Sequence, residues 1–197
     1  GIHGKGKSSS DLCATGPGMT QDEYRTQFAL WCMWSSPLLL SFDLNQPLSE
    51  DDRALITNKE LIAIDQDELA QPADFVAREG DLYYFEKPLS NGDVAIAVTN
   101  VGEKTQNFRL DLSRFPLTKG FRAFSVRDCQ QLTDIGAVKG GFDTSVRSHA
   151  TLVYRLSENI EIGNIVRRNL KKTLAPEEPK KKTTVPSTST APKRVRK

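Results

Sequence analysis

The sequence predicts an α/β piece, a helix, a strand and a second helix of a parallel fold, followed by an all-β antiparallel sandwich. Three observations predict this fold class. A capping motif at Thr20 precedes an apolar stripe with helical spacing, residues 38–42 form a short continuous apolar run, and apolar residues alternate from Phe75 onward. We expect the α/β piece in residues 1–70, the sandwich in residues 71–157 and a basic tail in residues 158–197.

The first helix has a start signal and a stop signal. The hydroxyl of Thr20 can accept a hydrogen bond from the amide of Glu23 while the Glu23 carboxylate reaches back, which is a capping box. Tyr24, Phe28 and Trp31 follow at i, i+4 and i+7 and share one helical face. Pro37 disfavours helical geometry in the residue before it, so the helix is expected to end by Ser36.

A buried strand and a second helix are expected next. The run Leu38–Phe42 (LLLSF) is apolar and short, which is typical of a strand covered on both faces in a parallel sheet. Ser49 then predicts a helix start. Glu50, Asp51 and Asp52 would lie in its first turn, where carboxylates favour the positive end of the helix dipole.

The second half of the chain alternates with the period of β-strands. Gly and Asn-Gly turn signals separate the runs, and their regular spacing predicts two antiparallel sheets. The apolar run at Val94–Val98 predicts a central strand, because both of its faces would be covered. The expected strands are Leu82–Glu86, Val94–Val98, Phe108–Leu112, Phe121–Val126 and Leu152–Leu156.

Four blocks of sequence carry a resemblance to a known family. They are Tyr24–Met33 (YRTQFALWCM), Ser36–Leu39 (SPLL), Phe42–Leu44 (FDL) and Asn58–Asp67 (NKELIAIDQD). In this order they resemble consecutive signatures of the α-galactosidases of glycoside hydrolase family 27. The resemblance weakens after Leu69 and ends near Leu156. It implies that the chain begins after the seventh strand of a (β/α)8 TIM barrel and continues into the family's C-terminal antiparallel β domain.

The resemblance also implies where the catalytic residues of such an enzyme lie. In the family the nucleophile and the acid/base are aspartates at the ends of the fourth and sixth barrel strands, and a further substrate-binding aspartate follows the seventh. No residue of this sequence matches those positions, and a retaining glycosidase needs two carboxyl groups about 5–5.5 Å apart. A whole barrel takes about 250 residues, more than this chain holds. We therefore expect no catalytic, cofactor-binding or metal-binding residue here, and no activity from the isolated chain.

For the intact enzyme the resemblance implies hydrolysis of terminal α-galactosides with retention, through a covalent glycosyl-aspartate and without a cofactor. The expected partners are the α-galactoside substrate and the missing N-terminal barrel portion, while homo-oligomer formation stays open. The resemblance implies a secreted, periplasmic or lysosomal protein. The sequence itself has no apolar run long enough to span a membrane and no basic-then-apolar leader at its start.

The net charge of +2 is the sum of a basic C-terminal segment and an acidic remainder of the chain. Residues 167–197 carry 11 Lys and Arg against 2 Glu, whereas the rest of the chain carries 16 against 23. Four prolines in this tail and the lack of a periodic apolar face predict disorder. A basic arm that contacts nucleic acid or another anionic surface is one interpretation. A solubilising linker is favoured over it, because the tail has no aromatic residue to stack on bases.

Two motifs compete on paper with the glycosidase interpretation. Gly1–Ser8 (GIHGKGKS) satisfies the phosphate-loop pattern, but such a loop must open a helix and no apolar periodicity follows until after the next helix cap, so nucleotide binding is disfavoured. Asp65, Asp67 and Glu68 are close enough to suggest a calcium loop, yet Ala70 stands where such a loop requires glycine. Capping and solvation explain these acids better. In the family the position of Asp65 is commonly Asn.

The cysteines and histidines form no recognisable site in the sequence. Cys13, Cys32 and Cys129 are odd in number and widely spaced, which argues against a disulfide framework and a zinc site. Cys32 is expected to be a small core residue. His3 and His149 are interpreted as a loop residue and a packed or surface histidine.

Two alternatives to the hydrolase interpretation remain open at this stage. The sandwich could be a non-catalytic carbohydrate-binding or assembly module, which would be supported if Tyr83 or Tyr84 formed an exposed sugar platform. The tail could bind nucleic acid or an anionic surface. The sequence also predicts that an isolated strand at Leu38–Phe42 would lack ladder partners, leaving residues 1–70 as the weakly folded part.

Overall fold

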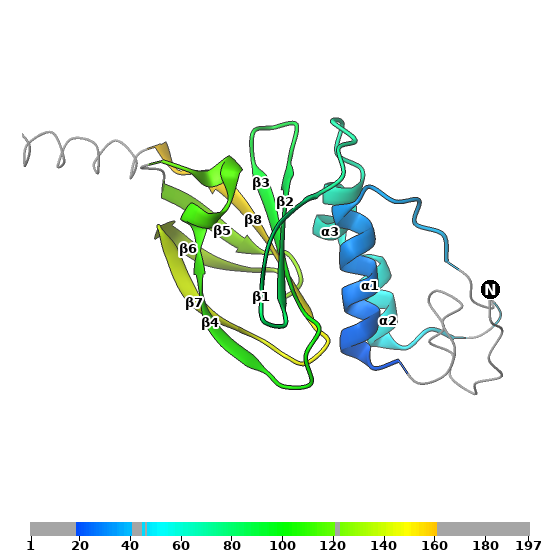
Figure 1. Cartoon of the computed structure of the whole chain (residues 1–197). Helices are drawn as coiled ribbons and strands as arrows, with labels where there is room; N and C mark the ends of the chain where they lie inside the picture. The colour runs from blue at the N-terminus through cyan, green and yellow to red at the C-terminus, as the bar shows by residue number, and fades with distance from the viewer. Residues whose placement is uncertain (1–18, 41–44, 46, 121–122, 161–197) are drawn as a thin grey trace, which may run out of the picture.

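The structure of the chain is a computed structural model that describes residues 19–40, 45, 47–120 and 123–160. Three layers are visible in Figure 1: helices α1–α3, a large antiparallel sheet, and a small sheet on the side away from the helices. The phosphate-loop pattern at residues 1–8 and the basic tail from residue 161 onward lie outside the described residues. No helix in the described part of the chain is long and apolar enough to cross a membrane.

Helix α1 (Gln21–Met33) begins as the sequence predicts. The Thr20 hydroxyl accepts from the amide of Glu23, and the Glu23 carboxylate accepts from the amide of Thr20 at 2.6 Å, so the capping box is confirmed. Tyr24 and Phe28 are 4% and 3% exposed and pack toward the large sheet. The sandwich thus covers Tyr24 and Phe28 of the predicted apolar stripe, whereas Trp31, its third residue, is only partly buried.

The structure does not show the strand predicted at Leu38–Phe42 in the part of that segment that it describes. Leu38–Leu40 is irregular, and Leu39 is 75% exposed; Ser41 and Phe42 lie outside the described residues. All strand pairs in the two described sheets are antiparallel, so this segment has no parallel neighbour there. A fully apolar run cannot hold a strand conformation by itself, because its amides and carbonyls need ladder partners.

The expected second helix is divided into α2 (Glu50–Ile56) and α3 (Lys59–Asp65). Ser49 caps α2 as predicted, accepting from the amide of Asp52 at 3.1 Å. The division occurs at Asn58, whose side-chain oxygen accepts from the amides of Glu60 and Leu61 and so starts a new helix. Asn58 also donates from Nδ2 to the carbonyl of Cys129, which fixes the break against the sandwich.

The sandwich holds a six-stranded sheet of order β1-β2-β3-β8-β5-β6 and a two-stranded sheet of β4 and β7. This confirms the two antiparallel sheets. β3 lies inside the large sheet and all its residues are buried, as the apolar run at Val94–Val98 predicts. The strands are β1 Asp74–Glu79, β2 Leu82–Pro88, β3 Val94–Asn100, β4 Gln106–Asp111, β5 Ala123–Asp128, β6 Thr133–Lys139, β7 Gly141–Val146 and β8 Thr151–Glu158.

Three of these strands lie outside the expected set, and composition explains each omission. β6 is exposed along most of its length and forms a sheet edge, so it shows no apolar alternation. β7 begins at Gly141, where a Cβ would lie 2.3 Å from the carbonyl oxygen of Leu110, so only glycine permits this approach to β4. β1 carries one strongly apolar pair, Phe75-Val76, followed by charged residues.

Two hydrophobic cores lie on opposite faces of the large sheet, because alternate residues of a strand point to opposite sides. Ala95, Ala97 and Val153 face the helices, whereas Ile96, Tyr154 and their alternating neighbours face β4 and β7. The small residues facing the helices allow α1 to approach the sheet closely. The larger ones fill the space between the two sheets.

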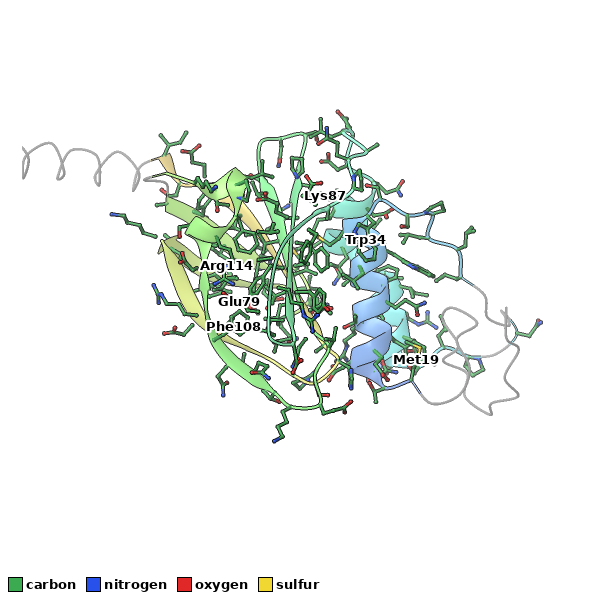
Figure 2. The ribbon with its side chains drawn as sticks, viewed as in Figure 1. Met19, Trp34, Glu79, Lys87, Phe108 and Arg114 are labelled. Carbon is green, nitrogen blue, oxygen red and sulfur yellow. The ribbon has the colours of Figure 1, made fainter. Side chains whose placement is uncertain are left out.

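Lys87 joins the helices to the large sheet. Its side chain is fully buried, and its Nζ donates to the carbonyls of Cys32 (3.1 Å) and Ile64 (2.6 Å) and to the hydroxyl of Ser35 (2.7 Å). Burial lowers the pKa of Lys87, while the nearby carboxylate of Asp65 opposes that shift. Figure 2 shows Lys87 and Trp34 at the end of α1 opposite Met19.

Replacing Lys87 by Met should destabilise the chain by about 2–4 kcal/mol, because two buried carbonyls would lose their donor. The measurement is urea unfolding of the full chain followed by circular dichroism. Lys139→Met, at an exposed position of β6, is the matched control and should change stability by less than about 0.5 kcal/mol. Equal effects of the two substitutions would contradict the role given to Lys87.

Hydrogen exchange should separate the irregular segment from the sheet. The amides of Leu38–Leu40 should exchange within seconds, because no described strand pairs with them, whereas those of β3 should be among the slowest. Mass spectrometry of the monomeric chain checks this. Slow exchange throughout Leu38–Leu40 would show that a strand forms there with a partner.

Candidate functional site

The acidic residues that the sequence draws attention to organise helix ends and turns. Asp52 is fully buried in the first turn of α2, where it accepts from the side-chain amide of Gln21 at 3.1 Å and from the Ser49 hydroxyl at 2.7 Å. Because Gln21 is the first residue of α1, Asp52 joins the N-termini of both helices. Its role is more specific than the general dipole effect expected from sequence.

Asp65 and Asp67 have separate structural tasks. Asp67 accepts from the amide and hydroxyl of Ser90 and from the amide of Leu69, which ties the end of the helical part to the β2–β3 turn. Asp65 is 4% exposed and accepts from the Gln66 side chain. Burial raises the pKa of Asp65, against the opposing effects of Gln66 and Lys87. The described residues contain no cluster of three or more His, Cys, Asp and Glu suited to a metal ion.

The described cysteines and histidine are not arranged as a nucleophilic site. Cys32 and Cys129 are buried free thiols in the core on the helix side, and desolvation raises the pKa of each to about 12. Both thiols therefore stay protonated at neutral pH and act as small core residues. His149 lies at the surface, with its Nε2 3.2 Å from Oε2 of Glu103. His3 and Cys13 are outside the described residues.

The aromatic residues do not form a flat sugar platform. Tyr84 is 2% exposed, and the guanidinium of Arg114 lies 4.5 Å from its ring centroid. Tyr83 has Arg78 over its ring at 5.0 Å and a tilted contact with Phe75. Rings that meet at steep angles present edges rather than a common plane. The condition set for the carbohydrate-binding alternative is therefore not met at Tyr83 or Tyr84.

A cleft lined by charged and amide side chains lies between the helices and the sandwich. We name it the junction cleft. It consists of two adjoining cavities of about 230 and 300 Å³. One side is formed by the N-terminal half of α1, by α2 and by the start of α3, and the other side by the turns that follow β5 and β7. Its principal residues are Asp22, Arg25, Asp51, Gln130, Leu132 and Arg147.

Ion pairs hold the charged residues of the junction cleft. Arg147 donates from Nε to Oδ2 of Asp22 at 2.7 Å and from Nη2 to its Oδ1. Arg25 lies 3.5 Å from Asp22 and 3.6 Å from Asp51. The hydrogen bonds from Arg147 are the main reason that the pKa of Asp22 is lowered. The cleft thus places carboxylates and guanidinium groups side by side in compensating pairs.

The turn after β5 is fixed independently of these ion pairs. Oδ1 of Asp128 accepts from the amides of Gln130 and Gln131 at 2.9 and 2.8 Å. Leu132, which follows, has φ +54 and is 49% exposed, although a branched apolar residue rarely adopts the left-handed region. The turn therefore holds Gln130 and Leu132 in set positions at the cleft.

No spacing in the sequence indicates the junction cleft. Its residues come from α1, from α2 and from two turns that follow these helices by roughly 80 to 125 residues in the sequence. Asp22 lies in the capping-box segment, Arg25 in the Tyr24–Met33 block and Asp51 in the first turn of α2, but none of these signals predicts that they meet. Only knowledge of how the helices dock on the sheet brings the six side chains together.

Two family models match consecutive parts of the chain. One, described as α-galactosidase A, matches residues 3–67, and the other, described as the α-galactosidase C-terminal β-sandwich domain, matches residues 79–156. The first match covers α1–α3 and the second begins at the end of β1. Together they follow the order of the helical layer and the sandwich.

Individual proteins show the same likeness. A probable α-galactosidase A of Aspergillus niger is 36% identical over 145 residues, and α-galactosidase A of Cellvibrio japonicus is 33% identical over 156 residues. These matches cover 71% and 75% of this chain but 26% and 38% of the relatives. The chain thus spans between a quarter and two fifths of their length.

Solved structures agree with the fold. α-Galactosidase I of Mortierella vinacea matches with a TM-score of 0.69 at 24% identity, covering 75% of this chain and 38% of that one. A GH27 β-L-arabinopyranosidase of Geobacillus stearothermophilus matches with a TM-score of 0.63 at 27% identity, covering 71% and 31%. The helical layer on a β-sandwich is thus an arrangement that these solved enzymes contain.

The Asp22–Arg147 pair should make stability depend on pH. The folded pKa of Asp22 is below its unfolded value, so the contribution is complete above the unfolded pKa and is lost as pH falls through the folded one. Asp22→Asn should cost about 0.5–1 kcal/mol at pH 7 and clearly less at pH 3. Urea unfolding at both pH values measures this.

Asp143→Asn is the control for that measurement, because Asp143 forms a looser and far more exposed pair with Arg109 at 3.7 Å. It should have little effect at either pH. An Asp22→Asn cost that does not change between pH 7 and pH 3 would contradict the ion-pair origin of the effect.

Proposed function

The chain belongs to the α-galactosidase family, glycoside hydrolase family 27, and matches its C-terminal part, and from this we propose that it is the C-terminal portion of a retaining α-galactosidase. The observation that carries the proposal is the pair of consecutive family matches, which fall on the helical layer and on the sandwich in the family's order. Hydrolysis of terminal α-galactosides is then the activity of the whole enzyme, to which this chain contributes a part.

The proposed organisation divides the chain into residues 1–70, 71–157 and 158–197. The first segment would supply the end of a (β/α)8 barrel and the second the C-terminal sandwich. Two observations support the first boundary: the family matches change between residues 67 and 79, and α3 ends at Asp65 before β1 starts at Asp74. The second boundary falls at the end of β8.

The acids of the described residues support a non-catalytic role for this portion. Retaining hydrolysis requires one carboxylate to attack the anomeric carbon and a second carboxyl group to protonate the leaving oxygen. Asp22, Asp52 and Asp67 instead accept hydrogen bonds from helix caps, turns and an arginine. We place the catalytic pair in the barrel portion that precedes this chain in the family.

The proposed contribution of this portion is to complete and support the barrel. Leu38–Leu40 would become the last strand once parallel neighbours are present, which would cover Leu39 and satisfy the backbone. α1 and α2 would hold the loops that enter the mouth of the barrel, because each helix of such a barrel begins at the catalytic end. The barrel portion and an α-galactoside are accordingly the proposed partners.

Activity measurements test the proposal. The 197-residue chain alone should not hydrolyse a chromogenic α-galactoside above the buffer rate, because it lacks the catalytic pair. Expression together with the polypeptide encoded immediately upstream of Gly1 should give hydrolysis with retention, which NMR of the released sugar detects. Replacing the expected nucleophilic aspartate of that polypeptide by Asn is the control and should abolish turnover.

Two results would contradict the proposal. Hydrolysis by the isolated chain that follows the protein through purification would mean that its own residues are catalytic. An upstream sequence without a barrel and paired aspartates would mean that the family relationship no longer indicates α-galactosidase activity for this protein.

A further inference from the structure

We propose that the junction cleft is a binding site for an uncharged saccharide. The proposal rests on the α-galactosidase function for the choice of ligand, and on the cleft itself for the binding chemistry. Four features carry it: the balance of charge, an unpartnered donor, an apolar wall and the position of the cleft relative to the helix N-termini.

The charge balance suits a neutral, hydroxyl-rich ligand. Asp22, Asp51 and Asp128 line the cleft together with Arg25 and Arg147, and the arginines are already paired with the first two acids. An anionic ligand would have to displace carboxylates from these arginines. A sugar hydroxyl both donates and accepts, so it can bridge a carboxylate oxygen and a guanidinium N–H without disturbing either charge.

Gln130 supplies an unpartnered donor. Its Nε2 is buried from solvent and has no hydrogen-bond partner within the described residues, although Gln130 contributes to both cavities of the cleft. A buried amide donor left without an acceptor has lost its hydrogen bonds to water without gaining others, which is unfavourable. Asp128 accepts a hydrogen bond from the backbone amide of Gln130, so the turn stays in place although the side-chain donor has no partner in the described part of the chain. A ligand oxygen would satisfy the donor.

Leu132 supplies the apolar wall. Its side chain is half-exposed, lines the cleft and is presented by a backbone conformation that leucine rarely adopts. Binding sites for small molecules combine apolar surface with a few polar groups that fix orientation. The C–H face of a pyranose ring would pack on Leu132 while its hydroxyls meet the ion pairs.

The position of the cleft supports a saccharide over other neutral ligands. Asp22 and Asp51 lie in the first turns of α1 and α2, at the end of α1 that carries Met19 (Figure 2). In a (β/α)8 barrel the helix N-termini lie at the end of the barrel that carries the active site. The cleft would therefore open at the end where the enzyme meets its sugar substrate.

Binding of methyl α-D-galactopyranoside to the ¹⁵N-labelled full chain tests the proposal. We expect a Kd in the millimolar range, with the largest chemical-shift changes at the side-chain amide of Gln130 and around Leu132. Gln130→Met should weaken binding at least fivefold without lowering the urea midpoint, because the lost donor has no protein partner. Gln71→Ala, at an exposed position before β1, is the matched control and should leave binding unchanged.

Leu132→Asn provides a second variant that does not depend on Gln130. Asparagine tolerates the left-handed backbone, so the turn is kept while the apolar wall is lost, and binding should again fall at least fivefold. A purely structural role for either residue would change the unfolding midpoint instead of the affinity.

Three results would overturn the proposal. One is the absence of saturable chemical-shift changes at galactoside concentrations up to 50-fold above a millimolar Kd. The others are shift changes that survive both substitutions, and tenfold tighter binding of D-galacturonate than of the neutral galactoside. The isolated chain is not expected to hydrolyse the galactoside, so the chemical-shift changes measure binding and not turnover. Hydrolysis with the upstream polypeptide but no binding would refute the saccharide site alone. Binding by the chain, together with no hydrolysis when the upstream polypeptide is expressed with it, would refute the α-galactosidase function alone.

Discussion

The docking of the helix layer on the large sheet depends on the ammonium group of Lys87. A charged group without solvent contact is tolerated only where acceptors surround it, and Lys87 finds two helix carbonyls and a hydroxyl. Those carbonyls belong to the C-terminal turns of α1 and α3, which are otherwise short of donors. One side chain of β2 therefore satisfies the ends of two helices and fixes both to the sheet. Burial raises the pKa of Asp65, and its carboxylate lies close enough to Lys87 to oppose the lowering of the pKa of that lysine.

The helix layer is tied to the sandwich at several further points along its length. Asn58 bonds the carbonyl of Cys129, Glu60 forms a bidentate ion pair with Arg127, and the Thr26 hydroxyl donates to the carbonyl of His149. The Asp22–Arg147 pair completes the series at the N-terminal end of α1. Small residues of β3 and β8 fill the space between these ties, so helix and sheet approach closely across a continuous apolar contact. The position of the helix N-termini is thus set by the sandwich.

The sequence predicts best those elements that depend on residues close to one another in the chain. The capping box at Thr20, the cap at Ser49 and the buried run at Val94–Val98 all depend on residues within a few positions of each other, and the structure confirms them. The strand expected at Leu38–Phe42 depends instead on parallel neighbours, and composition alone cannot supply those. β6 and β7 were missed because an exposed edge and a Gly-led strand carry little apolar alternation. The junction cleft could not be predicted, since Gln130 and Arg147 meet Asp22 only after α1 has docked on the sheet.

The same docking explains why a barrel would retain a sandwich beside it. The last helices of a (β/α)8 barrel bury one face against the barrel strands. In this chain another face of α1 is buried against the sandwich, because Tyr24 and Phe28 pack on the large sheet. A helix packed on only one side would be free to shift along its partner, whereas Lys87 at one end and Arg147 at the other fix α1 in register with the sandwich. Any displacement of the sandwich would then move Asp22 and Asp52 as a unit. The position of the helix N-termini and the packing of the sandwich are in this way coupled through a single helix.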